Sequence, residues 1–218
     1  MQEIIISGLQ NLYGLEPVIG NPYAKIDKSG MHFKITTYKV KGFGRLSVID
    51  MKAMLGLMKM ESVVVNAETR DLPLYSGDLI LAAGKCTLLQ EFYNTMVDPL
   101  TEEAKAPYRK VKEKYKTLPP YQTGPRWYDE IRYDFTLGAS GKEVKPLQQQ
   151  ITKDYLHAYL ENVATAPRCD PEEKRAKTQA YVDGLFKNGG PAVDQFKKLI
   201  GEEAAREVFE RYVFCCRR

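Results

Sequence analysis

The chain has 218 residues, 44% of them hydrophobic, which is enough to fill one core, so we expect a single domain over residues 1–218. Its 32 basic and 28 acidic side chains leave a net charge of only +4, which argues against a dedicated nucleic-acid-binding protein. No apolar run reaches 18 residues, and the start, MQEIIISGLQ, lacks the pattern of a secretory signal, so the sequence predicts a cytoplasmic protein with no membrane partner. We also expect it to be a monomer.

The first half of the chain is predicted to form strands. Segments 32–40, 43–51, 59–67 and 78–84 are rich in β-branched and aromatic residues, and Gly and Pro mark their ends. Because the connections between these segments are short, neighbouring strands are expected to be antiparallel.

The second half is predicted to be mainly helical. A helix is expected over 100–115, the Pro/Gly-rich stretch 117–127 is expected to be a loop, and a strand is expected at 130–138. From residue 147 apolar side chains recur about every fourth position, and further helices are predicted at 171–186, 191–200 and 203–213. The apolar positions are Leu147, Ile151, Tyr155, Tyr159 and Val163. The simplest assembly is a central antiparallel sheet flanked by helices.

Two carboxylates stand out in the predicted strands. Alternation puts Glu61 on the same strand face as Val63 and Val65, and Asp78 leads directly into an apolar run. A charge on an apolar face costs several kcal/mol unless it is solvated, paired or protonated. Glu61 and Asp78 could therefore face one cavity and raise each other's pKa, or each could be solvated at a strand end.

A basic run at 105–116 has two interpretations. It carries six basic side chains against the single acid Glu113, so it is either a solvated helix face or a docking patch for an acidic partner. Four aromatic residues could likewise stack on a flat ligand, although core packing is the commoner role. They are Tyr75, Tyr121, Trp127 and Tyr128.

Metal and hydrolase sites have little support in the sequence. His32 and His157 have no companion at ligand spacing, and the four cysteines show no C-x-x-C motif, so no metal site is expected and the thiols are expected to be reduced. Ser76 and Ser140 have no visible histidine partner for nucleophilic catalysis.

Two stretches resemble the ferredoxin-dependent bilin reductases. The segment DLPLYSGDLILAAG at 71–84 is similar to a family strand in which Leu-Pro, an aromatic and a small residue precede a catalytic aspartate, and Asp78 falls on that aspartate. The C-terminal stretch 181–214 is similar to the family's last two helices. Together with FGRLSVID at 43–50 the resemblance covers roughly residues 40–214. It implies an α/β/α sandwich with an antiparallel sheet, helices on both faces, and a bilin between the sheet and the C-terminal helices.

The resemblance also implies a reaction. Enzymes of this family reduce a linear tetrapyrrole of the biliverdin type, without flavin or metal, using single electrons from ferredoxin or flavodoxin while the aspartate protonates the pigment. Candidate substrate contacts on the shared motifs are Tyr75, Ser76, Asn188 and Phe214. Candidate contacts of the electron donor are Arg109, Lys110 and Lys112 in the basic run.

Several family positions differ in this chain. An ungapped match puts Glu61 at a family histidine, so Glu61 is predicted as a proton relay or second acid. A basic residue that grips a propionate falls near Gly138, so Lys142 or Lys145 is expected to serve instead. These departures leave two alternatives open. The protein could hold haem or a bilin without reducing it, or it could reduce another tetrapyrrole such as a chlorophyll catabolite.

Overall fold

The five long strands form where β-branched and aromatic residues alternate. The computed structural model describes residues 1–217, and in this range β3 (Met31–Val40), β4 (Gly44–Ala53), β5 (Met58–Ala67), β6 (Leu74–Ala82) and β7 (Lys85–Tyr93) pair antiparallel in chain order. The short strands β1 (Leu15–Pro17) and β2 (Lys25–Lys28) pair with β3 at one edge, and β8 (Leu137–Gly141) closes the other edge. The predicted antiparallel sheet is therefore confirmed.

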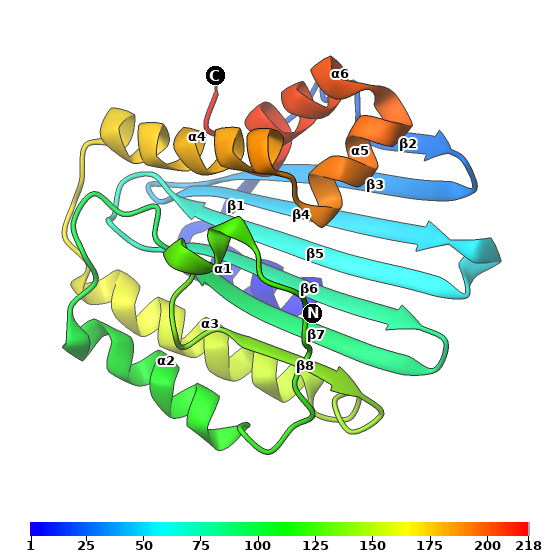
Figure 1. Cartoon of the computed structure of the whole chain (residues 1–218). Helices are drawn as coiled ribbons and strands as arrows, with labels where there is room; N and C mark the ends of the chain where they lie inside the picture. Colours follow the sequence, from blue (N-terminus) through cyan, green and yellow to red (C-terminus); the bar gives the residue numbers. More distant parts are fainter. Residues whose placement is uncertain (218) are drawn as a thin grey trace.

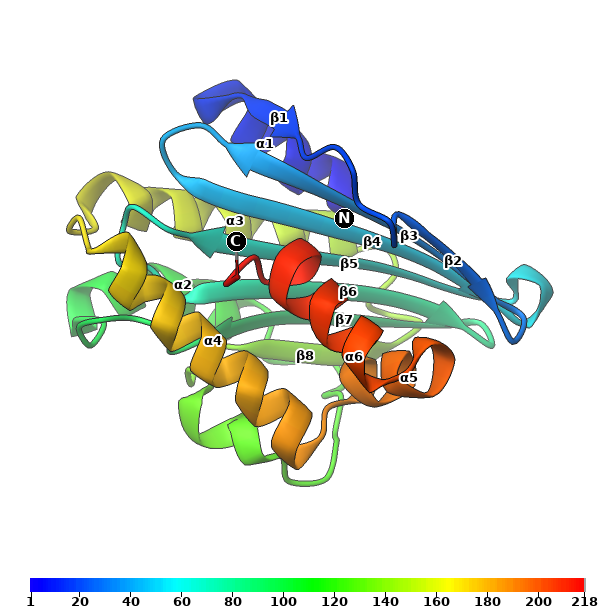
Figure 2. The same ribbon diagram turned by 90° about the horizontal axis from the view of Figure 1, so that it is seen from above.

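Helices cover both faces of this sheet (Figures 1 and 2). One face packs against α1 (Gln2–Tyr13), α2 (Glu102–Lys114) and α3 (Gln148–Thr165), and the other against α4 (Pro171–Asn188), α5 (Pro191–Ile200), α6 (Glu202–Glu207) and the π-helical turn η3 (Val208–Val213). Because side chains alternate along each strand, every long strand contributes to two separate cores. This arrangement confirms the α/β/α sandwich.

Local sequence explains where the main helices begin. The Thr101 hydroxyl accepts a hydrogen bond from the Ala104 N–H at the start of α2, and the Asp170 carboxylate accepts one from the Glu172 N–H at the start of α4. Pro171 occupies the first helical turn of α4, where its missing N–H removes no helical hydrogen bond.

A buried ion pair fixes the start of α4 against the sheet. The Lys174 ammonium lies 3.3 Å from the Asp71 carboxylate and donates to the Thr95 carbonyl at 2.9 Å. Asp71 also accepts hydrogen bonds from the N–H groups of Val97 and Asp98. Burial lowers the pKa of Lys174, and the attraction of Asp71 opposes this shift. The pair ties α4 to the loops that follow β5 and β7.

The prediction of a strand at 130–138 is wrong. Residues Trp127–Ile131 form a short 3-10 helix, η2, and the strand β8 begins only at Leu137. The Asp129 carboxylate accepts a hydrogen bond from the Arg126 N–H, which stabilises the helical turn. The alternation of apolar and polar residues in this stretch therefore does not determine its structure. Helix capping and the packing of aromatic side chains determine it instead.

Candidate functional site

A cavity of about 970 Å³ lies between the sheet and the C-terminal helices. We call it the pocket. Strands β3 to β7 form its floor, α4, α5 and η3 form its roof, and residues from the front segment, defined as 117–136, complete its wall. Its volume lies in the upper part of the range for small-molecule sites, roughly 300–1,000 Å³. Most of the wall is apolar and includes Phe33, Ile49, Met51, Met60, Val64 and Phe214.

Asp78 faces this pocket from the middle of β6. In the register of the sheet it lies beside Ser62 on β5 and Leu89 on β7. The Ser62 hydroxyl donates a hydrogen bond to the Asp78 carboxylate. Burial raises the pKa of Asp78 to about 6, the Ser62 hydrogen bond opposes this shift and the charge of Glu91 adds to it. A fraction of the molecules therefore carry a proton on Asp78 near neutral pH, as a general acid requires.

Glu91 is a second acid in the pocket, and the sequence analysis missed it. It lies opposite Ser76 in the register, two residues beyond the partner of Asp78, so the two acids are diagonal neighbours on adjacent strands. Its carboxylate accepts a hydrogen bond from the Tyr93 hydroxyl, with 2.9 Å between the oxygens, and lies 3.1 Å from a guanidinium nitrogen of Arg132. Burial raises the pKa of Glu91, and Tyr93 and Arg132 oppose the shift. The sequence signal that could have identified Glu91 is an acid that shares its strand face with an apolar and an aromatic residue.

Glu61 does not share the pocket with Asp78, so this prediction is wrong. Glu61 pairs with Leu79 in the register and projects from the opposite face of the sheet, where its carboxylate lies 3.0 Å from the N-terminal ammonium of Met1. The pocket-facing residue on β5 beside Asp78 is Ser62. Alternation assigns two faces to each strand, but the register that matches faces between strands is set by their connection.

Tyr75 is also on the opposite face and does not contact the pocket. Its ring stacks on Phe92 with centroids 4.7 Å apart, and its hydroxyl donates a hydrogen bond to the Gln90 side chain. Tyr75 is fully buried among apolar side chains under α3. Its place in the strand motif therefore reflects core packing in this chain.

The remaining predicted contacts divide into two groups. Ser76 and Phe214 line the pocket. Lys142 lies in the exposed turn after β8, and Asn188 is exposed at the end of α4; neither side chain lines the pocket, so both predictions are wrong. Their positions depend on how β8 and the α4–α5 connection are placed, which local motifs do not determine.

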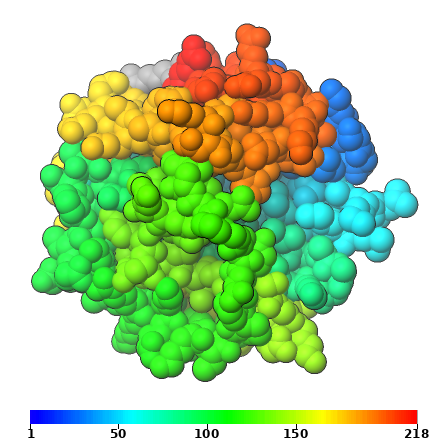
Figure 3. All heavy atoms as spheres, in the orientation of Figure 1, coloured from blue at the N-terminus to red at the C-terminus, as the bar shows by residue number. Residues whose placement is uncertain are grey.

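The front segment is held against the C-terminal layer by an aromatic contact. The Trp127 indole N–H donates to the Gly189 carbonyl at 2.8 Å, and its ring lies so close to Gly184 that a Cβ there would be 2.3 Å from a ring carbon. Tyr128 packs edge-on to Tyr93, with centroids 5.8 Å apart. Figure 3 shows this segment in green, below the orange C-terminal helices. Tyr121 and Tyr128 line the pocket, while Trp127 holds the front segment through its contacts with Gly184 and Gly189.

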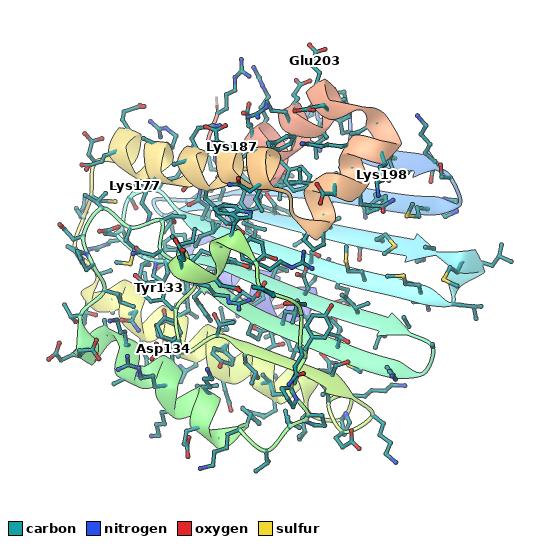
Figure 4. All side chains as sticks on the ribbon, in the orientation of Figure 1. Tyr133, Asp134, Lys177, Lys187, Lys198 and Glu203 are labelled. Carbon is teal, nitrogen blue, oxygen red and sulfur yellow. The ribbon has the colours of Figure 1, made fainter. Side chains whose placement is uncertain are left out.

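Basic side chains also reach the pocket. Arg126, Arg132 and Lys112 contribute to its lining, and the Lys112 ammonium donates to the backbone carbonyl of Asp134. Figure 4 shows Asp134 beside α2. Arg132 is engaged with Glu91 and Asp129, so Arg126 and Lys112 are the better candidates for binding a carboxylate of a ligand.

Ion pairs neutralise much of the basic run on α2. Arg109 pairs with Glu102 and, at 3.0 Å, with Asp134, while Lys114 pairs with Asp154 at 2.6 Å. Lys110 is exposed and makes no ion pair within the described residues. Docking of a partner at Arg109, Lys110 and Lys112 stays a prediction.

Neither histidine contributes to the pocket. His32 lies 2.6 Å from Asp27, and His157 lies 3.1 Å from Glu161. Within residues 1–217, no three His, Cys, Asp or Glu side chains come together as a metal site would require. No helix in this range has the length and apolar character to cross a membrane.

Comparisons with known proteins identify the fold. No family model matches the chain, and no curated protein matches its sequence. Among solved structures, the chain is similar to phytochromobilin synthase from tomato in complex with biliverdin, with a TM-score of 0.76 and 13% sequence identity. The match covers 99% of this chain and 82% of that chain. The protein therefore has the fold of phytochromobilin synthase.

Proposed function

We propose that the protein binds a linear tetrapyrrole of the biliverdin type in the pocket and reduces it with electrons from ferredoxin or flavodoxin. The observation that carries this proposal is Asp78, a carboxylic acid whose pKa is raised to about 6 and which faces a large, mostly apolar pocket. The shared fold supports the choice of ligand, because the similar structure is a complex with biliverdin.

The chemistry requires an acid at this position. Reduction of one double bond of the pigment adds two electrons and two protons, and each electron brings negative charge into a poorly solvated site. A proton transferred from Asp78 offsets that charge and makes the next electron easier to add. Glu91, on the adjacent strand, is the residue best placed to supply or relay the second proton.

The rest of the pocket fits a long, flat molecule with two carboxylates. Apolar side chains such as Met51, Met60 and Phe214 cover the pyrrole rings, and the carboxylates of Asp78 and Glu91 accept hydrogen bonds from pyrrole N–H groups. Arg126 of the front segment and Lys112 of α2 bind the propionates through charge-assisted hydrogen bonds.

A spectroscopic experiment tests binding and protonation together. Biliverdin mixed with the purified protein should give a red-shifted visible spectrum that contains a protonated component at neutral pH. In Asp78→Asn the pigment should still bind, but the protonated component should disappear and turnover with reduced ferredoxin should fall on the order of 10²-fold. An unchanged spectrum and rate in Asp78→Asn would contradict the assignment of Asp78 as the proton donor.

Binding without reduction is the second candidate. The observation that favours it is that the Glu91 carboxylate is engaged with Arg132 and Tyr93, which leaves Asp78 as the acid of this pair that has no basic partner within residues 1–217. Anaerobic incubation of the pigment complex with reduced ferredoxin separates the two functions. A complex that keeps its spectrum over many donor equivalents is a binding protein.

A further inference from the structure

The connection between β4 and β5 exposes large apolar side chains at the end of the sheet. We call residues 54–57, which include the 3-10 turn η1 (Met54–Gly56), the apolar tip. The exposed fractions are 66% for Met54, 105% for Leu55 and 74% for Leu57. Single exposed leucines are common, but three large apolar side chains within four residues at a protruding tip are not.

The backbone of the apolar tip is unusual for these residue types. Met54 and Leu55 both have a φ of the left-handed region, 52° and 54°, where glycine, asparagine or aspartate is normally found. A turn that only reversed the chain could use those residues without strain. Met54 and Leu55 therefore hold their side chains outward at a conformational cost, which is typical of a functional segment.

Unpaired lysines surround the apolar tip. The register places Met31, Ala53, Met58, Ala82 and Lys85 in one row, so the turns that join β2–β3, β4–β5 and β6–β7 lie at the same end of the sheet. Four exposed lysines at this end make no ion pair within residues 1–217; they are Lys28, Lys52, Lys59 and Lys85. We call these four the lysine collar.

The charges of the lysine collar are not balanced locally. Lys52 and Lys59 are direct cross-strand partners, and like charges in this position are destabilising. The nearby acid Asp27 is engaged with His32 at 2.6 Å, and Asp50 lies in register between Lys34 and Glu61. The collar is therefore complementary to an external surface that carries negative charge.

We propose that this end of the sheet docks on an anionic lipid surface. Met54, Leu55 and Leu57 enter the boundary between headgroups and acyl chains, while the lysine collar contacts the lipid phosphates. The shape supports a lipid surface over a protein partner, because Figures 1 and 3 show the cyan tip as a narrow projection, whereas a specific protein interface buries about 800 Å² on each side. This proposed peripheral contact departs from the sequence-based expectation of no membrane partner, and the experiment below decides between them.

The apolar tip also lies next to the pocket. Met58, which follows the tip directly, lines the pocket together with Met31 and Met51. A lipid surface bound at the tip would therefore lie at one end of the pocket. The docking itself is independent of any pigment and of the proposed reaction.

Vesicle flotation with the full chain tests the proposal. Vesicles of phosphatidylcholine with phosphatidylglycerol should carry the protein upward at low salt, while pure phosphatidylcholine vesicles should carry much less, and salt should release it. The double variant Leu55→Ser/Leu57→Ser and the charge-reversed variant Lys52→Glu/Lys59→Glu should each bind at least tenfold more weakly. Leu12→Ser is the matched control, because Leu12 is 60% exposed on α1 near the other end of the sheet, and it should bind as the unmodified chain does.

A depth measurement distinguishes lipid insertion from other contacts. Leu55→Trp adds one indole to the single natural Trp127, and brominated lipids in anionic vesicles should quench the added fluorescence. Failure of the unmodified chain to float, or equal flotation of Leu55→Ser/Leu57→Ser, would overturn the proposal. A tip variant that changes only the oligomeric state in gel filtration would mean that the tip binds a second copy of the chain, which would also overturn it.

Discussion

Asp78 and Glu91 are diagonal neighbours on β6 and β7, and both carboxylates face the pocket. Glu91 is paired with Arg132, and its negative charge, when it is ionised, is one cause of the raised pKa of Asp78. This relationship couples the protonation of Asp78 to a residue that the sequence analysis did not identify. The coupling can be measured on the protein alone.

The substitution Glu91→Gln should lower the pKa of Asp78 from about 6 toward its ordinary value near 3.9. Burial is the larger cause of the shift, so part of the increase should remain. The measurement is a pH titration of the carboxyl carbon of Asp78 by NMR, with Asp78→Asn to assign the signal. Glu61→Gln is the matched control: Glu61 lies on the opposite face, so this variant should leave the titration unchanged, and equal shifts in both variants would contradict the coupling.

The raised pKa of Asp78 should also reduce stability at neutral pH. The native state binds more protons at Asp78 than the unfolded state between about pH 4 and pH 6, so the free energy of unfolding falls as pH rises through this window. A pKa shift of this size lowers the free energy of unfolding above pH 7 by at most about 3 kcal/mol. Because Asp78 is only half-buried, solvent screening reduces the expected loss to about 2 kcal/mol.

Asp78→Asn removes that cost because the amide never ionises. The variant should be more stable than the unmodified protein by about 1–2 kcal/mol at pH 8 and equally stable near pH 4, as measured by urea denaturation. Higher stability together with lower turnover would be expected for a catalytic acid kept in an unfavourable environment. If the two proteins differ by the same amount at both pH values, ionisation of Asp78 is not the cause.

The contact between Trp127 and Gly184 predicts a different kind of effect. Gly184→Ala places a methyl group about where the indole lies, since its Cβ would be 2.3 Å from a ring carbon. The front segment should move away from α4, at a cost of roughly 1–3 kcal/mol, and pigment affinity should fall with it. The fluorescence of Trp127, the single tryptophan, should shift to longer wavelength as the ring becomes more exposed.

Gly124→Ala provides the control for this experiment. Gly124 belongs to the same front segment, and a Cβ added there meets nothing within 4 Å. This variant should keep the stability, the fluorescence and the pigment affinity of the unmodified protein. Equal losses in both variants would mean that the segment is sensitive to any substitution and that the Trp127 contact has no special role.

These residues show which features could be predicted from sequence. The long strands, the helices of the second half and the position of Asp78 at a pocket follow from local patterns and from a motif that surrounds the acid. Glu61 was assigned to the wrong face because alternation describes one strand at a time, while the β5–β6 register places Ser62 beside Asp78. The helix α1 and the 3-10 helix η2 were missed because tertiary contacts, such as Met1 with Glu61 and Trp127 with Gly184, stabilise them.

The electron donor of the proposed reaction is an acidic protein if it is a ferredoxin. Lys110 is exposed on α2, makes no ion pair within the described residues and does not line the pocket. Lys112 is less suitable for a test because it lines the pocket and donates to Asp134. If the donor docks on α2, Lys110→Glu should slow reduction several-fold at low salt and weaken its salt dependence, while pigment binding stays unchanged.

Lys187→Glu on α4 is the comparison that locates the docking surface. Figure 4 shows Lys187 on the outer side of α4, at the top of the view, whereas α2 lies at the bottom. It carries the same charge change at an exposed position that does not line the pocket. A slower reaction in Lys110→Glu alone would support docking on α2, and a slower reaction in Lys187→Glu alone would place the donor on the roof of the pocket. Equal rates for both variants and the unmodified protein at low salt would mean that neither lysine contributes to the encounter with the donor, because a charge at a docking rim acts mainly on the rate of association.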